Sequence, residues 1–429
     1  MWERYALSPM RELWTLEAQY RRWLKVELAA LAALEEMGEV PPGAAAAVRE
    51  KATIDVDRIL EIERQVGHDL IAFLSALEES VGEEGRWLHY GLTSSDVKDT
   101  ALSLAIRDAL DILLEKAAAL AHTLWELATR YREAPLIGRT HGQYAEPITF
   151  GLKVLVWYDW LSRVQERLQR AREEISVGKL SGAVGTYAHF PPQAEELALA
   201  KLGLKPCPVT TQVIPRDRHV RVFSALASAA SLVEAIALEV RHLSRSEVGE
   251  VAEGRPEGSS AMPHKENPIL AERLCGLARI VRGSLPPALE NCALWHERDM
   301  SHSSVERILL PQAFMLADYM LAKAEELLAN LRVFPERMLE RLLSARGLPF
   351  SEGLLLALVK KGMSRREAHA LVAELSARAA GEDREFSEVA AADPRVSGLL
   401  SREELEGVFD LQRALARVPE IFRRFSPPG

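Results

Sequence analysis

Five long stretches of helical hydrophobic periodicity dominate this sequence. They run from residue 94 to about 131, 147 to about 175, 219 to about 246, 269 to about 294, and 303 to about 331. At 1.5 Å per residue, a helix of about 30 residues is about 45 Å long, so such helices must pack lengthwise. No succession of short alternating strands accompanies them. The periodicity predicts an all-α fold with a central bundle of very long helices.

The long helices divide the chain into three expected parts. The central bundle domain spans residues 94–342, and shorter, charge-rich helices form an N-terminal helical domain, 1–93, and a C-terminal helical domain, 343–429. Long-helix segments such as ITFGLKVLVWYDWL are too apolar for one side to face water. We therefore expect part of their surface to be buried against other subunits.

Composition and charge exclude several classes of protein. A formal net charge of −9, without a basic stripe, argues against a nucleic-acid partner. Charged residues interrupt the apolar runs before about 18 residues, and MWERYALSPMREL lacks the apolar core of a signal peptide. Cys207, Cys275 and Cys292 are too scattered for a disulfide framework. We expect a cytoplasmic protein without a membrane partner.

The segment 258–268, GSSAMPHKENP, carries the densest set of reactive groups. Two hydroxyls, a lysine and a carboxamide lie within nine residues, just before a helix expected to begin near Ile269. Backbone N–H groups, the lysine and the helix N-terminus could hold a carboxylate whose charge grows in a transition state. The same residues would also suit a plain capped loop, so their spacing alone leaves both readings open.

Three segments resemble the fumarase/aspartase superfamily. GSSAMPHKENP resembles its signature, while HYGLTSSDV at 89–97 and GRTHGQYAEPITFG at 138–151 resemble its first and second conserved regions, in the same order. Members eliminate fumarate, or a close relative, from a succinyl group attached through nitrogen or oxygen. The resemblance implies a homotetramer in which motif regions from different subunits meet at each active site.

The resemblance also implies roles within the signature. Ser259 would be the base that removes the proton beside a carboxylate, with Ser260 as the alternative. Lys265 and loop N–H groups would activate it as an oxyanion. Lys265 and Asn267 would bind the carboxylate that takes up the developing charge.

The departing nitrogen needs a proton, and the resemblance assigns that donor as well. His141, in RTHGQ, would be the general acid, and Glu272 would orient its imidazole. A carboxylate in the first turn of a helix is also favoured by the helix dipole alone, so Glu272 has a purely structural alternative.

Further segments resemble the adenylosuccinate lyase branch of this superfamily. Arg4 and Tyr5 match its opening motif, in which the pair contacts the nucleotide. GHDLIAF matches a motif in which His68 supports catalysis, and the neighbouring Asp69 would bind substrate. Gly67 stands where this branch often has arginine, so a phosphate or carboxylate contact is lost or supplied elsewhere.

The remaining matches concern the anionic ends of the substrate. His89, Thr93 and Ser94 would serve the succinyl or phosphate end, and Gln212, in TTQVIPRD, would bind substrate. Segment 295–307, WHERDMSHSSVER, resembles the phosphate-binding stretch of this branch. Guanidinium groups suit phosphate and carboxylate geometry, and the implied set is Arg273, Arg298, Ser303 and Arg307.

The function implied is elimination of fumarate from adenylosuccinate, giving AMP, and from succinyl-aminoimidazole carboxamide ribotide. We expect no cofactor and no metal: His296 and His302 do not share a helix face, and HExxH is absent. The alternatives are 3-carboxymuconate cycloisomerase or another superfamily lyase and, in a different class, a catalytically silent structural homologue.

Overall fold

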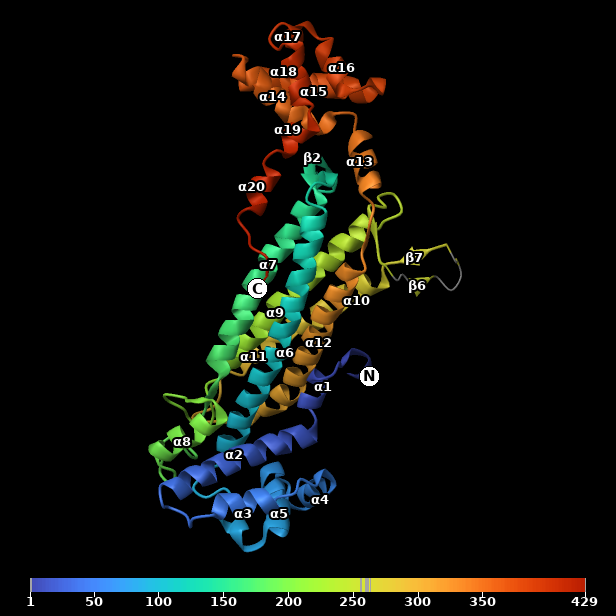
Figure 1. Cartoon of the computed structure of the whole chain (residues 1–429). Helices are drawn as coiled ribbons and strands as arrows, with labels where there is room; N and C mark the ends of the chain where they lie inside the picture. The colour runs from blue at the N-terminus through green and yellow to red at the C-terminus, as the bar shows by residue number, and fades with distance from the viewer. Residues whose placement is uncertain (1, 255–256, 259–261, 263, 429) are drawn as a thin grey trace. The chain divides into compact units, whose positions relative to one another are not determined.

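The structure is a computed structural model that describes residues 2–254, 257–258, 262 and 264–428. Helices make up most of it, so the all-α prediction is confirmed (Figure 1). The chain forms two compact units. Unit 1 comprises Met1–Ala118, Ser162–Glu234 and Leu274–Lys323, and unit 2 comprises Ala119–Leu161, Ala235–Arg273 and Ala324–Gly429. The predicted division at residues 93 and 342 is a different one and stays a prediction.

Four of the five predicted long helices form as continuous helices: α6 (Ser94–Arg130), α7 (Phe150–Ile175), α9 (Asp217–Leu243) and α12 (Ser301–Ala329). The fifth prediction, a single helix from 269 to about 294, is wrong. Helix α10 (Ile269–Gly283) ends, and α11 (Leu285–Glu290) begins with prolines in its first turn. Pro286 and Pro287 have no N–H to continue α10, but their fixed φ suits the start of a new helix.

Polar contacts between side chains join the long helices within each unit. In unit 1, Lys116 of α6 pairs with the buried Asp318 of α12. In unit 2, Lys153 Nζ of α7 lies 2.6 Å from Glu239 Oε1 of α9. Helix α9 is long and apolar enough to cross a membrane, yet 61% of its most apolar stretch is buried inside the structure. Its packing is that of a core helix.

Short helices at the N-terminus build the first core of unit 1. Tyr20 and Trp23 pack their rings against Phe73, with ring centroids 5.8 and 5.5 Å apart. This aromatic group is almost fully buried. The elements are η1 (Trp2–Tyr5), α1 (Met10–Leu13), α2 (Leu16–Glu36), α3 (Ala44–Lys51), α4 (Val56–Val66), α5 (Asp69–Val81), η2 (Gly82–Trp87) and, later in the chain, α8 (Pro192–Leu202).

The C-terminal helices of unit 2 have a core of their own, in which Leu358, Leu375 and Phe386 are fully buried. Ser364 and Ser401 each begin a helix with a capping box. The elements are α13 (Pro335–Leu343), η3 (Leu348–Phe350), α14 (Ser351–Lys360), α15 (Arg365–Glu382), α16 (Phe386–Ala391), α17 (Pro394–Ser397), α18 (Arg402–Val408), α19 (Leu411–Leu415) and α20 (Val418–Phe422).

Short two-stranded sheets occupy several joints between helices. Strands β1 (Pro135–Thr140) and β2 (Gln143–Thr149) form an antiparallel hairpin between α6 and α7. Its two-residue turn, His141–Gly142, has φ values of 53° and 75°, as a type I′ turn requires. The other pairs are β3 (Val177–Gly178) with β4 (Lys205–Pro206), β5 (Val251–Ala252) with β8 (Arg332–Val333), and β6 (Glu257–Gly258) with β7 (Glu266–Asn267).

A buried ion network connects α6, the start of α9 and α12 within unit 1. Arg216 forms bidentate bonds with Asp99, at 2.6 and 3.0 Å, and with Glu306, at 2.9 and 3.1 Å. His219 Nδ1 lies 2.9 Å from Glu306 Oε1. Burial alone would raise the pKa of Glu306, but His219 and Arg216 lower it to about 2.

Glu306→Gln should lower the free energy of unfolding by about 3–5 kcal/mol at pH 7, because it leaves Arg216 short of a buried partner. The carboxylate's contribution is complete above its ordinary pKa of 4.5 and disappears as pH falls toward about 2. The difference between wild type and variant should therefore shrink between pH 5 and about 2. Urea unfolding across this range measures it, with exposed Glu78→Gln as control. A difference independent of pH would contradict the ion-pair account.

Candidate active site

The expected site residues belong to both units. Unit 1 carries Arg4, Tyr5, His68, Asp69, His89, Thr93, Ser94, Gln212, Arg298, Ser303 and Arg307. Unit 2 carries His141, Lys265, Asn267, Glu272 and Arg273. Ser259, and its alternative Ser260, lie outside the described residues.

Asp69 is the centre of the polar group in unit 1. Its Oδ1 accepts hydrogen bonds from Lys98 Nζ and, at 2.8 Å, from Leu70 N, while Arg307 Nη2 donates to Oδ2 at 3.0 Å. Burial alone would raise the pKa of Asp69, but the hydrogen bond and charge of Lys98, with Arg307, lower it overall. Asp69 is therefore an ionised carboxylate that holds two cations in place.

A cavity of about 400 Å³ opens beside this carboxylate. Lys98, Arg298 and Arg307 line it together with Ser303, and Arg22 and Arg216 also contribute to its wall. The carboxylates of Glu63, Asp69, Asp99 and Glu306 line it as well, and aromatic and aliphatic side chains, among them Trp14, Tyr20, Trp23 and Leu60, form another part of its wall. Such a lining suits an anionic group attached to a less polar body.

Gln212 and Arg298 contact each other. Arg298 Nη1 donates to Gln212 Oε1 at 3.0 Å, and Gln212 N donates to Glu297 O at 3.3 Å. The buried Nε of Arg298 has no hydrogen-bond partner among the described residues. One guanidinium donor at the cavity is thus unsatisfied.

His68 is the N-cap of α5. Its Nδ1 accepts from Ile71 N at 3.4 Å, and its Nε2 lies 3.5 Å from Ser94 Oγ. The same Nδ1 lies 3.5 Å from Asp69 Oδ1. Gly67, where an arginine was expected, ends α4 with a left-handed φ of 69°. That conformation is cheap for glycine and strained for arginine.

His89 is held by a buried carboxylate. Glu27 Oε1 lies 2.8 Å from its Nδ1, and Glu27 Oε2 accepts from its backbone N at 2.8 Å. Glu27 is only 1% exposed, and His89 has a φ of 60°. Both contacts fix an imidazole in a backbone region that non-glycine residues seldom adopt.

The start of α6 is secured by a second buried carboxylate. Thr93 N donates to Asp96 Oδ2 at 2.8 Å, and the fully buried Lys179 pairs with the same side chain. Burial raises the pKa of Asp96 despite Lys179. Ser94, the first residue of α6, is thereby placed beside His68.

Arg4 and Tyr5 lie in η1 at the N-terminus. Tyr5 packs edge-on against Tyr319 of α12, with ring centroids 5.2 Å apart. The side chain of Arg4 is exposed. The structure thus fixes the tyrosine by packing and leaves the arginine at the surface.

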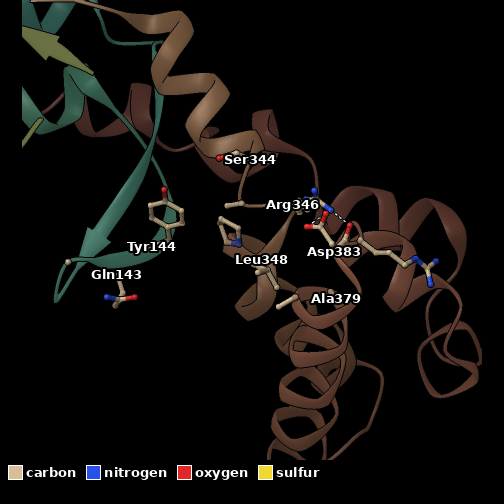
Figure 2. A pocket seen from close by; sticks show the side chains of 12 residues that line it. Gln143, Tyr144, Ser344, Arg346, Leu348, Ala379 and Asp383 are labelled. Atoms are coloured by element: carbon tan, nitrogen blue, oxygen red, sulfur yellow. Dashed lines mark hydrogen bonds and ion pairs between the residues drawn. The ribbon is translucent and has the colours of Figure 1, made fainter. Parts of the chain in front are cut away.

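His141 lies in unit 2 at the exposed turn of the β1–β2 hairpin. Gly142, Gln143 and Tyr144 line a cavity of about 520 Å³, whose other wall comes from residues 344–349 and the end of α15 (Figure 2). Within the described chain, His141 and Glu272 do not hydrogen-bond to each other. The expected coupling of Glu272 to His141 stays a prediction.

The ends of the signature segment are anchored in unit 2. Glu253 accepts from the first backbone N–H groups of α10, at 2.8 Å from Ala271 N and 3.3 Å from Leu270 N. Arg332 Nε donates to Glu253 O at 3.1 Å, and Arg332 also pairs with Glu266. Burial raises the pKa of Glu253, and the nearby charge of Glu272 adds to this.

The other signature residues sit close to these anchors. Asn267 lies in β7, Glu272 and Arg273 lie in the first turn of α10, and Lys265 is exposed just before β7. Among the residues that the structure describes, no group of three or more His, Cys, Asp or Glu side chains is arranged to hold a metal ion. His302 is buried, and its Nδ1 has no partner among those residues.

The sequence did not predict the side chains that hold the expected site residues in place. Glu27 fixes His89, Lys98 pairs with Asp69, and Arg139 of β1 forms a bidentate pair with Glu250. Glu27 carried one usable signal, because it is a carboxylate on the apolar face of α2. The others have long-range partners that no local pattern reveals.

Two family models match the chain: one described as "Lyase" over residues 3–283 and one described as "Adenylosuccinate lyase C-terminus" over residues 347–425. Similar curated proteins are the adenylosuccinate lyases of Thermotoga maritima, 51% identical with 99% of each chain covered, and of Bacillus subtilis, 44% identical with 99% covered. The adenylosuccinate lyase of Aquifex aeolicus is 46% identical, with 96% of this chain and 95% of the relative covered.

Solved structures with the same fold include the fumarate lyase from Mesorhizobium sp. BNC1, with a TM-score of 0.89, 30% identity and coverage of 97% and 98% of the two chains. Another is the 3-carboxy-cis,cis-muconate lactonizing enzyme from Pseudomonas putida, with a TM-score of 0.88, 30% identity and coverage of 99% and 97%. These structures share the fold at lower identity than the curated relatives. The full-length relatives and the C-terminal match together show that this chain belongs to the adenylosuccinate lyase family.

Proposed function

We propose that this chain cleaves adenylosuccinate to AMP and fumarate, and succinyl-aminoimidazole carboxamide ribotide to fumarate and the corresponding amide, in the cytoplasm. Relatives named adenylosuccinate lyase support the reaction across almost the whole chain. The structural observation that carries the proposal is the cavity bordered by Lys98, Arg298 and Arg307. A protein with a net charge of −9 needs such a local cluster to bind a multiply anionic nucleotide.

The phosphate would lie against these cations and Ser303. Arginine forks match the geometry of phosphate oxygens, and Lys98 adds a point charge. Asp69 orders the cluster, because it accepts hydrogen bonds from Lys98 and Arg307. The aromatic wall of the cavity suits the nucleoside part of the same ligand.

Elimination proceeds by acid and base groups. Ser259 removes the proton from the carbon beside a carboxylate of the succinyl group. The electron pair of the broken carbon–hydrogen bond moves into that carboxylate, which becomes an aci-carboxylate. Lys265 and Asn267 stabilise the added charge. That electron pair then forms a new carbon–carbon double bond as the carbon–nitrogen bond breaks, and His141 protonates the departing nitrogen.

His141→Ala and Ser259→Ala should each lower kcat by about 10²–10⁴-fold, the usual contribution of a positioned proton-transfer group. A spectrophotometric assay of adenylosuccinate cleavage measures this, and wild type treated with EDTA should keep its rate. A variant that retains most of its kcat would remove that residue from the mechanism. If wild type instead turns over only 3-carboxymuconate, the chain belongs functionally with the cycloisomerases.

Lys98→Met should raise the KM for adenylosuccinate, and weaken AMP binding, by about 10–100-fold, because a charge-assisted hydrogen bond contributes about 1.5–3 kcal/mol. The change in kcat should be smaller. The exposed Lys25→Met on α2 is the matched control for loss of one positive charge. Steady-state kinetics and calorimetric titration with AMP measure both. An unchanged KM and AMP affinity would exclude Lys98 from the phosphate site.

We also propose a homotetramer with shared active sites. Support comes from large apolar side chains left exposed on the long helices of one chain, such as Val156 of α7 and Leu238 of α9, which are 58% and 43% exposed. Val156→Asp and Leu238→Asp should give smaller assemblies with little activity. Sedimentation velocity and the lyase assay on the same fractions test this. A fully active monomer would contradict it.

A further inference from the structure

The turn that carries His141 extends beyond the packed part of its hairpin. Ile137 is the last apolar residue of β1 in a core cluster, where it packs with Leu342 and Ala345. Past Ile137 the strand continues through Gly138 and Arg139 to the turn, and the cavity of about 520 Å³ flanks that end (Figure 2). Apolar packing therefore does not fix the position of the turn, and a polar contact must.

Arg139 makes that contact. Its Nη1 donates to Glu250 Oε2 at 2.9 Å and its Nη2 to Glu250 Oε1 at 2.7 Å. The Glu250 side chain is 0% exposed and that of Arg139 is 18% exposed. The guanidinium carbon also lies 5.6 Å from the ring centre of Tyr144, which is paired with Arg139 across the hairpin. One guanidinium thus holds both strands just below the turn.

The other end of this contact is equally well anchored. Glu250 N donates to Leu243 O at 2.9 Å, and Phe334 N donates to Glu250 O at 3.1 Å. The next residues form β5, which pairs with β8 and leads into the signature segment. The Arg139–Glu250 pair therefore joins the hairpin that carries His141 to the start of β5, the strand that precedes the signature segment.

We propose that Arg139 is a positioning residue for His141: its bidentate bond to Glu250 fixes where the His141 turn lies relative to β5, the strand that precedes the signature segment. The inference rests on the proposed role of His141 as acid. In this role Arg139 acts through the hairpin, since Nη1 and Nη2 each donate to one oxygen of the buried Glu250. A lysine cannot replace that fork, since it offers a point charge in place of a planar pair of donors.

The positioning matters because the turn is strained. His141 has a φ of 53°, which a non-glycine residue keeps only when its surroundings hold it. A displacement of about 1 Å between reacting groups can lower a rate by about 10²-fold. Loss of the bidentate pair should consequently reduce proton delivery while leaving substrate binding intact.

Arg139→Lys and Glu250→Gln should each lower kcat by about 10–100-fold and change KM by less than about threefold. The deciding measurement is a double-mutant cycle with His141→Ala. In the His141→Ala background, Arg139→Lys should cause no further loss, because a positioning residue acts only through the imidazole. Tyr144→Leu, which leaves the buried ion pair intact, should lower kcat about two- to fivefold with the same dependence on His141.

The control is Arg395→Lys, which breaks an equally bidentate arginine–glutamate pair with Glu374, at 2.8 and 3.0 Å, between α15 and α17. It should keep wild-type kcat. Equal losses of kcat from Arg139→Lys with and without His141 would overturn the positioning role. So would an unchanged kcat in Arg139→Lys, Glu250→Gln and Tyr144→Leu. If wild type is inactive or His141→Ala is fully active, the proposed function fails as well, so the two failures are distinguishable.

Discussion

The buried pairing of Arg216 with Asp99 and Glu306 is the interaction on which the cavity of unit 1 depends. The Arg216 guanidinium lies between Asp99 of α6 and Glu306 of α12, just before α9 begins, and all three side chains are buried. Ser303 and Arg307 are within one turn of Glu306, and Lys98 adjoins Asp99. The same contacts that join these helices therefore place three of the side chains that line the cavity. Without them, buried charges on α6 and α12 would be left unpaired.

Charge is arranged in two layers around that cavity. The inner layer is compensated within the protein, since Arg216 has two carboxylates and Glu306 also has His219. The outer layer is incompletely compensated, because Asp69 alone partners both Lys98 and Arg307. The phosphate of the proposed substrate would supply the missing negative charge. A protein that is acidic overall can in this way bind an anion at one place without becoming a general polyanion binder.

Particular residues show how far the sequence could be interpreted. Helical periodicity located α6, α7, α9 and α12 to within a few residues, since apolar spacing is a local property. It failed between 269 and 294, where the prolines after Ser284 break the helix. The His141–Gly142 turn escaped notice because its left-handed backbone depends on strand pairing across the hairpin. The roles of Ser259, Lys265 and Glu272 were inferred from motif resemblance and stay predictions.

The sequence by itself determined the all-α class, the long helices, the family and the residue types available for chemistry, because motifs and periodicity are written in consecutive residues. Only the tertiary structure decided which distant side chains pair with the residues of the expected site and hold them in place. Glu27 is 62 residues from His89, and Glu250 is 111 residues from Arg139. Pairings over such separations depend on which helix faces meet when apolar surface is buried, and no local pattern records that choice.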